Sequence, residues 1–263
     1  SAGAKLPSAG MPELAKDNPD LRGVDERLEP DWIVQWLLDP VSLRNEATMP
    51  AVALGANRDE RRAAATDIAA FLTQQSSHDG DAEVDNAVDD RSVDEGELLF
   101  EQYRCIACHR FTPPAEEDYF DRVSLHFAGA KFRRGALRKF LQAPTEHYAW
   151  TRMPDMQLSE ADASALAACV RDRAKGACET PADVSSADPQ RGEQMFHRSG
   201  CANCHPVADT GSRVEAVSLA AGLHSAGCLG PSGQDAKAPE FSFSDEERAA
   251  LLEFGKTEFD SLA

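Results

Sequence analysis

The chain has 263 residues, and its 27 lysines and arginines against 45 aspartates and glutamates give a formal net charge of −18. This acidic balance argues against nucleic-acid binding, which needs clustered positive charge, and against docking on anionic lipid. The length suffices for two or three small domains, and no apolar run approaches the roughly 20 residues of a transmembrane helix.

The first part of the chain, residues 1–77, predicts helices. Its polar start, residues 1–16, has no signal-like apolar block, so an exported form is expected to have lost its leader already. Asn57 and Glu60 form a capping pair that predicts a helix after Met49. An earlier amphipathic helix that ends at a proline is predicted from Leu28, Ile33, Trp36, Leu37 and Pro40.

Two polar stretches divide the chain. Residues 78–95 are dense in carboxylates and poor in large apolar residues, and residues 177–188 are rich in Pro, Ser and Asp. We therefore predict linkers there, between parts at 1–77, 96–176 and 189–263. Period-two alternation is weak throughout, so an all-α fold is expected.

The three parts resemble one another in halves, which indicates an internal repeat. A shift of 104 positions carries the first part onto the second, and Met49-Pro50 falls on Met153-Pro154 without a gap. A shift of 96 positions carries the front of the second part onto the third. The residues that coincide in this second shift are Gly96 with Gly192, Phe100 with Phe196, and Cys105-Ile106-Ala107-Cys108-His109 with Cys201-Ala202-Asn203-Cys204-His205.

Both later parts also end in a segment with a capping signal. Ser159 precedes Asp162 by three positions, and Ser244 precedes Glu247 by three positions. A serine side chain can accept a hydrogen bond from the backbone N–H three residues on, which is typical of a helix start. We therefore predict a closing helix in each of these parts.

The repeated pentapeptide has the Cys-x-x-Cys-His spacing of a haem c attachment site. Two thiols three positions apart can each add to one vinyl group of the porphyrin, and the next imidazole becomes the proximal iron ligand. Zinc knuckles usually lie about 15–20 residues apart, far closer than these motifs. A dithiol redox site needs a parallel-sheet context that the sequence lacks. We predict two covalently attached haem c groups, bound by Cys105, Cys108 and His109 and by Cys201, Cys204 and His205.

Residues 96–175 resemble a class I c-type cytochrome domain, with a helix, the CxxCH motif, a loop, a helix, Met-Pro and a C-terminal helix in that order. The resemblance implies tandem small cytochrome c-like helical domains. It also implies that Met153 is the distal iron ligand opposite His109, a pairing that favours reduced iron. Six-coordinate iron leaves no position for a substrate, so this site is expected to transfer electrons.

The part at 189–263 departs from the family pattern at the distal ligand. The expected Met-Pro is replaced by Ala-Pro at Ala238, and alanine has no donor atom. The alternative ligands within the shortened distal segment are His224, Cys228 and Lys237. The iron can also stay five-coordinate, or take a ligand from another part or another chain.

Two other potential donors precede the second motif. Met195 is predicted to pack within its helix, and His197 is predicted to lie beside it on the solvent side. Neither is expected to bind iron.

The part at 1–77 has the opposite deficiency, because Met49 has no CxxCH motif upstream. Three explanations stay open. Met49 can be apolar filler in a duplicated half-domain that has lost its haem, or the chain can begin partway through a larger precursor. In the third explanation Met49 reaches the second haem and supplies the missing thioether, which makes one unit from two distant halves.

Three cysteines remain after the haem thiols: Cys169, Cys178 and Cys228. The family attaches haem in an exported, oxidising compartment such as the periplasm, where a disulfide is also permitted. Both a Cys169–Cys178 and a Cys178–Cys228 bridge stay open. Three is an odd number, so at least one thiol stays free, pairs outside the chain or binds iron.

The expected function is electron transfer between redox partners by a di-haem c-type cytochrome, rather than catalysis. The acidic surface suits a redox protein with a basic docking face. The alternative is a peroxidase-like di-haem enzyme whose second haem is open or unusually ligated. The part at 1–77, which lacks a motif, also suggests a module of a larger complex.

Overall fold

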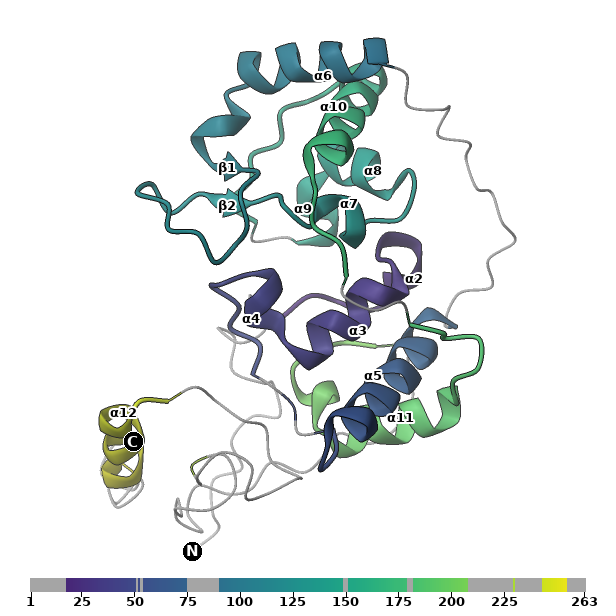
Figure 1. Ribbon diagram of the computed structural model, residues 1–263, viewed down its shortest axis with the longest axis vertical. Helices are drawn as coiled ribbons and strands as arrows, with labels where there is room; N and C mark the ends of the chain where they lie inside the picture. The colour runs from purple at the N-terminus through teal and green to yellow at the C-terminus, as the bar shows by residue number, and fades with distance from the viewer. Residues whose placement is uncertain are drawn as a thin grey trace, which may run out of the picture.

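The computed structural model describes residues 18–50, 52, 54–74, 90–148, 151–178, 182–207, 229 and 243–254. The described chain is predominantly helical, which confirms the predicted all-α class (Figure 1). Its strands are two residues long each, β1 (His109–Arg110) and β2 (Val123–Ser124), and they pair in parallel. No helix in the described ranges is both long and apolar enough to cross a membrane.

The helices follow the order of the three sequence parts. The first part contains α2 (Val24–Arg27), α3 (Pro30–Leu38), α4 (Pro40–Leu43) and α5 (Arg58–Thr73). The second contains α6 (Asp90–Gln102), which begins within the stretch 78–95 predicted as a linker, the 3-10 turn η1 (Cys105–Ala107), α7 (Ala128–Lys131), α8 (Ala136–Gln142), α9 (Pro144–His147) and α10 (Glu160–Arg173). The third contains α11 (Pro189–Arg198), the 3-10 turn η2 (Cys201–Asn203) and α12 (Asp245–Phe254).

The predicted capped helices are confirmed. The side chains of Asn57, Ser159 and Ser244 accept hydrogen bonds from the backbone N–H three residues later, at 2.9, 3.1 and 3.2 Å. These bonds satisfy amides that have no partner within the helix, and so fix where α5, α10 and α12 begin.

One hydrophobic core lies within the second part. Helix α6 crosses α10, and Phe100, Leu137 and Leu166 are buried where these helices meet α8. The crossing is close because Gly96 has no side chain, and a Cβ there would lie 2.6 Å from the Cβ of Cys169. We call residues 90–178 the middle unit.

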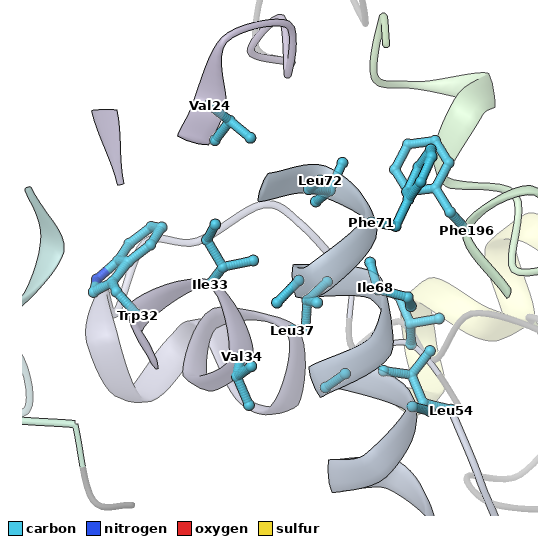
Figure 2. Close-up of a cluster of buried hydrophobic side chains, with 14 of the residues drawn as sticks. Val24, Trp32, Ile33, Val34, Leu37, Leu54, Ile68, Phe71, Leu72 and Phe196 are labelled. Carbon is cyan, nitrogen blue, oxygen red and sulfur yellow. The ribbon is translucent and has the colours of Figure 1, made fainter. Parts of the chain in front are cut away.

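The other core is assembled from two distant segments. Helix α11 of the third part packs against α5 of the first part, and α3 covers α5 as well (Figure 1). Figure 2 shows Phe196 of α11 pointing toward Phe71 of α5, and their ring centroids lie 5.6 Å apart. We call residues 18–74 and 182–207 together the composite unit.

Helix α12 forms as predicted but buries none of its residues. Figure 1 shows it well away from α11, the helix that precedes it in the third part. The surface of α11 is covered by α5 instead.

The two units meet at an antiparallel bridge between Leu28 and Phe132. The shift of 104 positions carries Leu28 onto Phe132, so each unit contributes the equivalent residue. Two hydrogen bonds flank this bridge, both at 3.0 Å. The N–H of Glu29 donates to the carbonyl of Lys131, and the N–H of Arg133 donates to the carbonyl of Arg27. The same shift carries the donor and acceptor of one bond onto the positions of the other. The interface is therefore pseudo-two-fold, with one patch meeting its equivalent.

Candidate haem-attachment sites

The two CxxCH motifs have the same local fold. Each begins after a residue in the left-handed region, Arg104 with φ 58° and Gly200 with φ 75°, which caps a 3-10 turn. The N–H of the second cysteine then donates to the carbonyl of the first, at 3.1 Å in both Cys105-to-Cys108 and Cys201-to-Cys204. The turn positions two thiols beside one histidine, as covalent attachment of one porphyrin requires.

The thiols differ in exposure within each motif. Cys105 and Cys201 are half-buried against the cores, whereas Cys108 and Cys204 are exposed. Burial raises the pKa of the Cys105 thiol, and it raises the pKa of Cys201 to about 11. Both motifs therefore present one sheltered and one accessible sulfur.

The histidines are oriented by backbone carbonyls. Nδ1 of His205 lies 3.0 Å from the carbonyl oxygen of Pro19, so this nitrogen carries the proton and Nε2 keeps its lone pair. Burial lowers the pKa of His205, and the carbonyl of Pro19 partly opposes that effect. A neutral imidazole with a free Nε2 is the form that binds a metal.

His109 has the same environment in the middle unit. Burial lowers the pKa of His109, and the backbone of Val123 opposes that effect. The buried Nδ1 of His109 nevertheless makes no hydrogen bond within the described residues. The shift of 104 positions carries Pro19 onto Val123. Equivalent backbone positions therefore lie next to the two histidines, but only His205 is oriented by a hydrogen bond there.

The backbone register next to each motif is also equivalent. The N–H of Leu125 donates to the carbonyl of Arg110 at 2.7 Å, and the N–H of Leu21 donates to the carbonyl of Pro206 at 2.9 Å. The first bond lies within one continuous segment. The second joins the two segments of the composite unit.

No family model, curated protein or solved structure matches this chain. The chemistry of the sites is therefore inferred from their own residues. Within the described ranges, no three or more His, Cys, Asp or Glu side chains gather as ligands of a metal ion. Haem iron takes only its axial ligands from the protein, so a pair of donors is the relevant arrangement.

Met153 lies in the middle unit with the first motif. It is half-buried, and its backbone N–H donates to Oγ1 of Thr151 at 3.2 Å. Met156 packs against the core of the middle unit, and its equivalent in the composite unit, Val52, is buried. Met156 is thus a core residue, which leaves Met153 as the predicted iron donor.

Met49 lies in the composite unit with the second motif, and both Met49 and Cys201 pack against its core. Nε1 of Trp36 donates to the sulfur of Met49 at 3.0 Å. The other distal candidates, His224, Cys228 and Lys237, lie outside the described residues, as does Ala238.

Met195 packs against the composite core, which confirms its predicted role. The prediction for His197 is wrong, because both of its ring nitrogens are buried and neither has a hydrogen-bond partner among the described residues. Its ring packs edge-on against Phe196, with the centroids 5.7 Å apart.

The described cysteines are free thiols, so the Cys169–Cys178 bridge is not formed. Cys169 is buried where α6 crosses α10, whereas Cys178 packs against the composite core. Burial raises the pKa of each of these thiols to about 11. Cys228 lies outside the described ranges.

Sequence reasoning missed the residues that support the ligands. Besides Pro19 and Val123, the buried Arg110 follows the first motif and donates to the carbonyls of Pro113, Pro114 and Arg122 at 2.8, 3.1 and 3.2 Å. It holds the loop after the motif in place. The shift of 104 positions pairs Pro19 with Val123 and was the signal that could have identified them.

Proposed function

We propose that this chain is an electron-transfer protein with two haem c groups, carried by tandem cytochrome c-like units in an exported, oxidising compartment. The observation that carries the proposal is the equivalence of the two motifs. Each has the same 3-10 turn, a sheltered and an accessible thiol, and a half-buried histidine directly after the second cysteine, although the chain connects the surrounding elements differently.

Each residue of a motif has one role in the proposal. Cys105 and Cys108 would attach the first haem, with His109 as proximal ligand and Met153 as distal ligand. Cys201, Cys204 and His205 would serve the second haem in the same way. When bound, haem supplies a reversible one-electron couple, and the burial and hydrogen bonds of the axial ligands tune its potential.

The surface beside the first motif suits transient docking. Ile106, between the two haem-binding cysteines, is 54% exposed, and Tyr119 and Phe120 are exposed nearby in the loop that Arg110 supports. Nη1 of Arg122 donates to the carbonyl of Ile106 at 3.4 Å, which joins this loop to the motif. The exposed carboxylates of Glu116, Glu117 and Asp121 flank these apolar residues in the loop, so the proposed partner is a redox protein with a basic docking face.

The test is expression of the chain in a host that exports proteins and attaches haem c. The expected mass exceeds that of the polypeptide by two haem groups, and replacement of both cysteines in one motif by alanine removes one of them. A colourless product of unmodified mass would refute the proposal.

Carbon monoxide then separates a carrier from an enzyme. A carrier whose two irons each have two axial ligands is expected to bind no carbon monoxide when reduced. A wild-type protein that binds one equivalent and turns over peroxide would instead be a di-haem enzyme.

A further inference from the structure

We propose that Met49 is the distal iron ligand of the second haem, so that one binding site is assembled from residues 18–74 and 182–207. The inference rests on the proposed function, since it assigns a ligand to the haem at Cys201 and Cys204. It makes the first part of the chain a component of the second haem site.

The helices that enclose the site belong to different segments. Phe196 of α11 is 1% exposed and Ile68 of α5 is 1% exposed, so each is covered by the other segment and its neighbours. A Cβ at Gly192 would lie 2.9 Å from the backbone nitrogen of Ile68. In the middle unit, α6 approaches α10 just as closely at Gly96.

A buried carboxylate adds a polar connection between the segments. Asp67 of α5 is 3% exposed, and its Oδ1 accepts a hydrogen bond from the N–H of Asp188 at 2.9 Å. Its other oxygen pairs with the guanidinium of Arg191 in α11. A buried carboxylate is costly without such partners, so this pair selects α11 as the neighbour of α5.

The proximal side of the site is completed by the first part. The carbonyl of Pro19 orients His205. The N–H of Leu21 donates to the carbonyl of Pro206, the residue that follows His205. In the middle unit the corresponding groups, Val123 and Leu125, follow the motif in the same segment. The bond from Leu125 to Arg110 thus recurs in the composite unit as the bond from Leu21 to Pro206, made there between two segments.

The distal side follows from the same equivalence. Met49 is the residue that corresponds to Met153, and it follows α3 and α4 as Met153 follows α8 and α9. Trp36 donates a hydrogen bond to its sulfur, and a thioether sulfur has a second lone pair for iron. Trp36 is accordingly a positioning residue for Met49.

The experiment compares Met49→Leu with the wild-type two-haem protein. Leucine keeps about the volume of methionine but has no donor atom, and volume-conserving swaps of this kind are the best tolerated in a core. The reduced variant is expected to bind one equivalent of carbon monoxide where the wild type binds none, and one of its two couples is expected to shift to lower potential. The oxidised variant should also lose half of the sulfur-to-iron charge-transfer absorption.

Two controls define the result. Met195→Leu, in the same unit, is expected to leave the spectra and potentials unchanged, and Met49→His is expected to restore a closed site with a different spectrum. The inference would be overturned if the Met49→Leu protein bound no carbon monoxide at either haem and kept the full sulfur-to-iron charge-transfer absorption. Opening of the second haem by His224→Ala, with no response to Met49→Leu, would place the ligand there. A wild-type chain without haem would instead refute the proposed function.

Discussion

Replacement of Gly192 by alanine tests the packing of α11 on α5 without reference to a cofactor. A Cβ at this position would lie 2.9 Å from the backbone nitrogen of Ile68 and closer still to the carbonyl of Asp67. Carbon contacts are optimal at about 3.5–4.0 Å. Backbone atoms cannot rotate away, so the two helices would have to separate by roughly 1 Å to reach that range.

The expected cost follows from two opposing effects. Overpacking of this kind typically costs about 1–3 kcal/mol, whereas Gly→Ala within a helix gains roughly 0.5–1 kcal/mol. Because the close contacts are with backbone atoms, the upper end of the overpacking range applies, and the net loss is about 2–2.5 kcal/mol of unfolding free energy. For a chain of this size each kcal/mol lowers Tm by about 2–4 °C, so we expect a decrease of roughly 4–10 °C.

Thermal and urea unfolding, followed by circular dichroism, measure this loss, and two further glycines calibrate it. Gly129→Ala is the matched control, since the nearest atom to its Cβ would be the Cβ of Ala174 at 3.6 Å. It should be as stable as the wild type or slightly more so. Gly96→Ala should destabilise the middle unit to a similar extent as Gly192→Ala destabilises the composite one. Equal stability of Gly192→Ala and Gly129→Ala would refute the packing of α11 on α5.

Three further predictions concern charge. Asp67→Asn should lower the unfolding free energy by about 1–3 kcal/mol, because the buried Asp67 side chain loses its ion pair with the half-exposed Arg191; an unchanged urea midpoint would contradict this. Burial lowers the pKa of Lys131 below its ordinary 10.5, with Arg27 and Arg44 adding to the effect and Tyr148 opposing it. The unfolded chain then binds more protons, so wild-type stability relative to Lys131→Met should rise as pH approaches 10.5 from below, measured by urea midpoints; a flat difference would contradict it. In stopped-flow oxidation, added salt should slow a cationic oxidant and accelerate an anionic one, because the net charge is −18; equal salt effects would refute steering by the acidic surface.

Local patterns predicted the elements well. The i, i+3, i+4 spacing that includes Ile33 and Leu37 gave α3, and the capping residues Asn57 and Ser159 gave the starts of α5 and α10. These features depend on neighbours within one helical turn, so the sequence alone carries them.

The pairing of α11 could not be predicted in the same way. Both α5 and α12 begin with a side-chain cap and offer apolar residues, so either helix satisfies the local pattern. The choice depends on contacts between distant residues, namely Phe71 with Phe196 and Asp67 with Arg191. Sequence reasoning therefore left Met49 with three explanations, because a helical period does not identify the partner of a helix.

The interface between the units explains why the first part of the chain matters to both sites. Trp32 stacks on Trp36 at 5.0 Å, and Trp36 holds the sulfur of Met49. The ammonium group of Lys131, from the middle unit, lies 5.0 Å from the ring centres of both Trp32 and Phe132. One cation therefore contacts an aromatic ring of each unit, next to the pseudo-two-fold bridge. Trp32 and Trp36 lie on α3, which precedes Met49, and Phe132 precedes α8, which precedes Met153, so a displacement of the interface is expected to move the supports of both methionines.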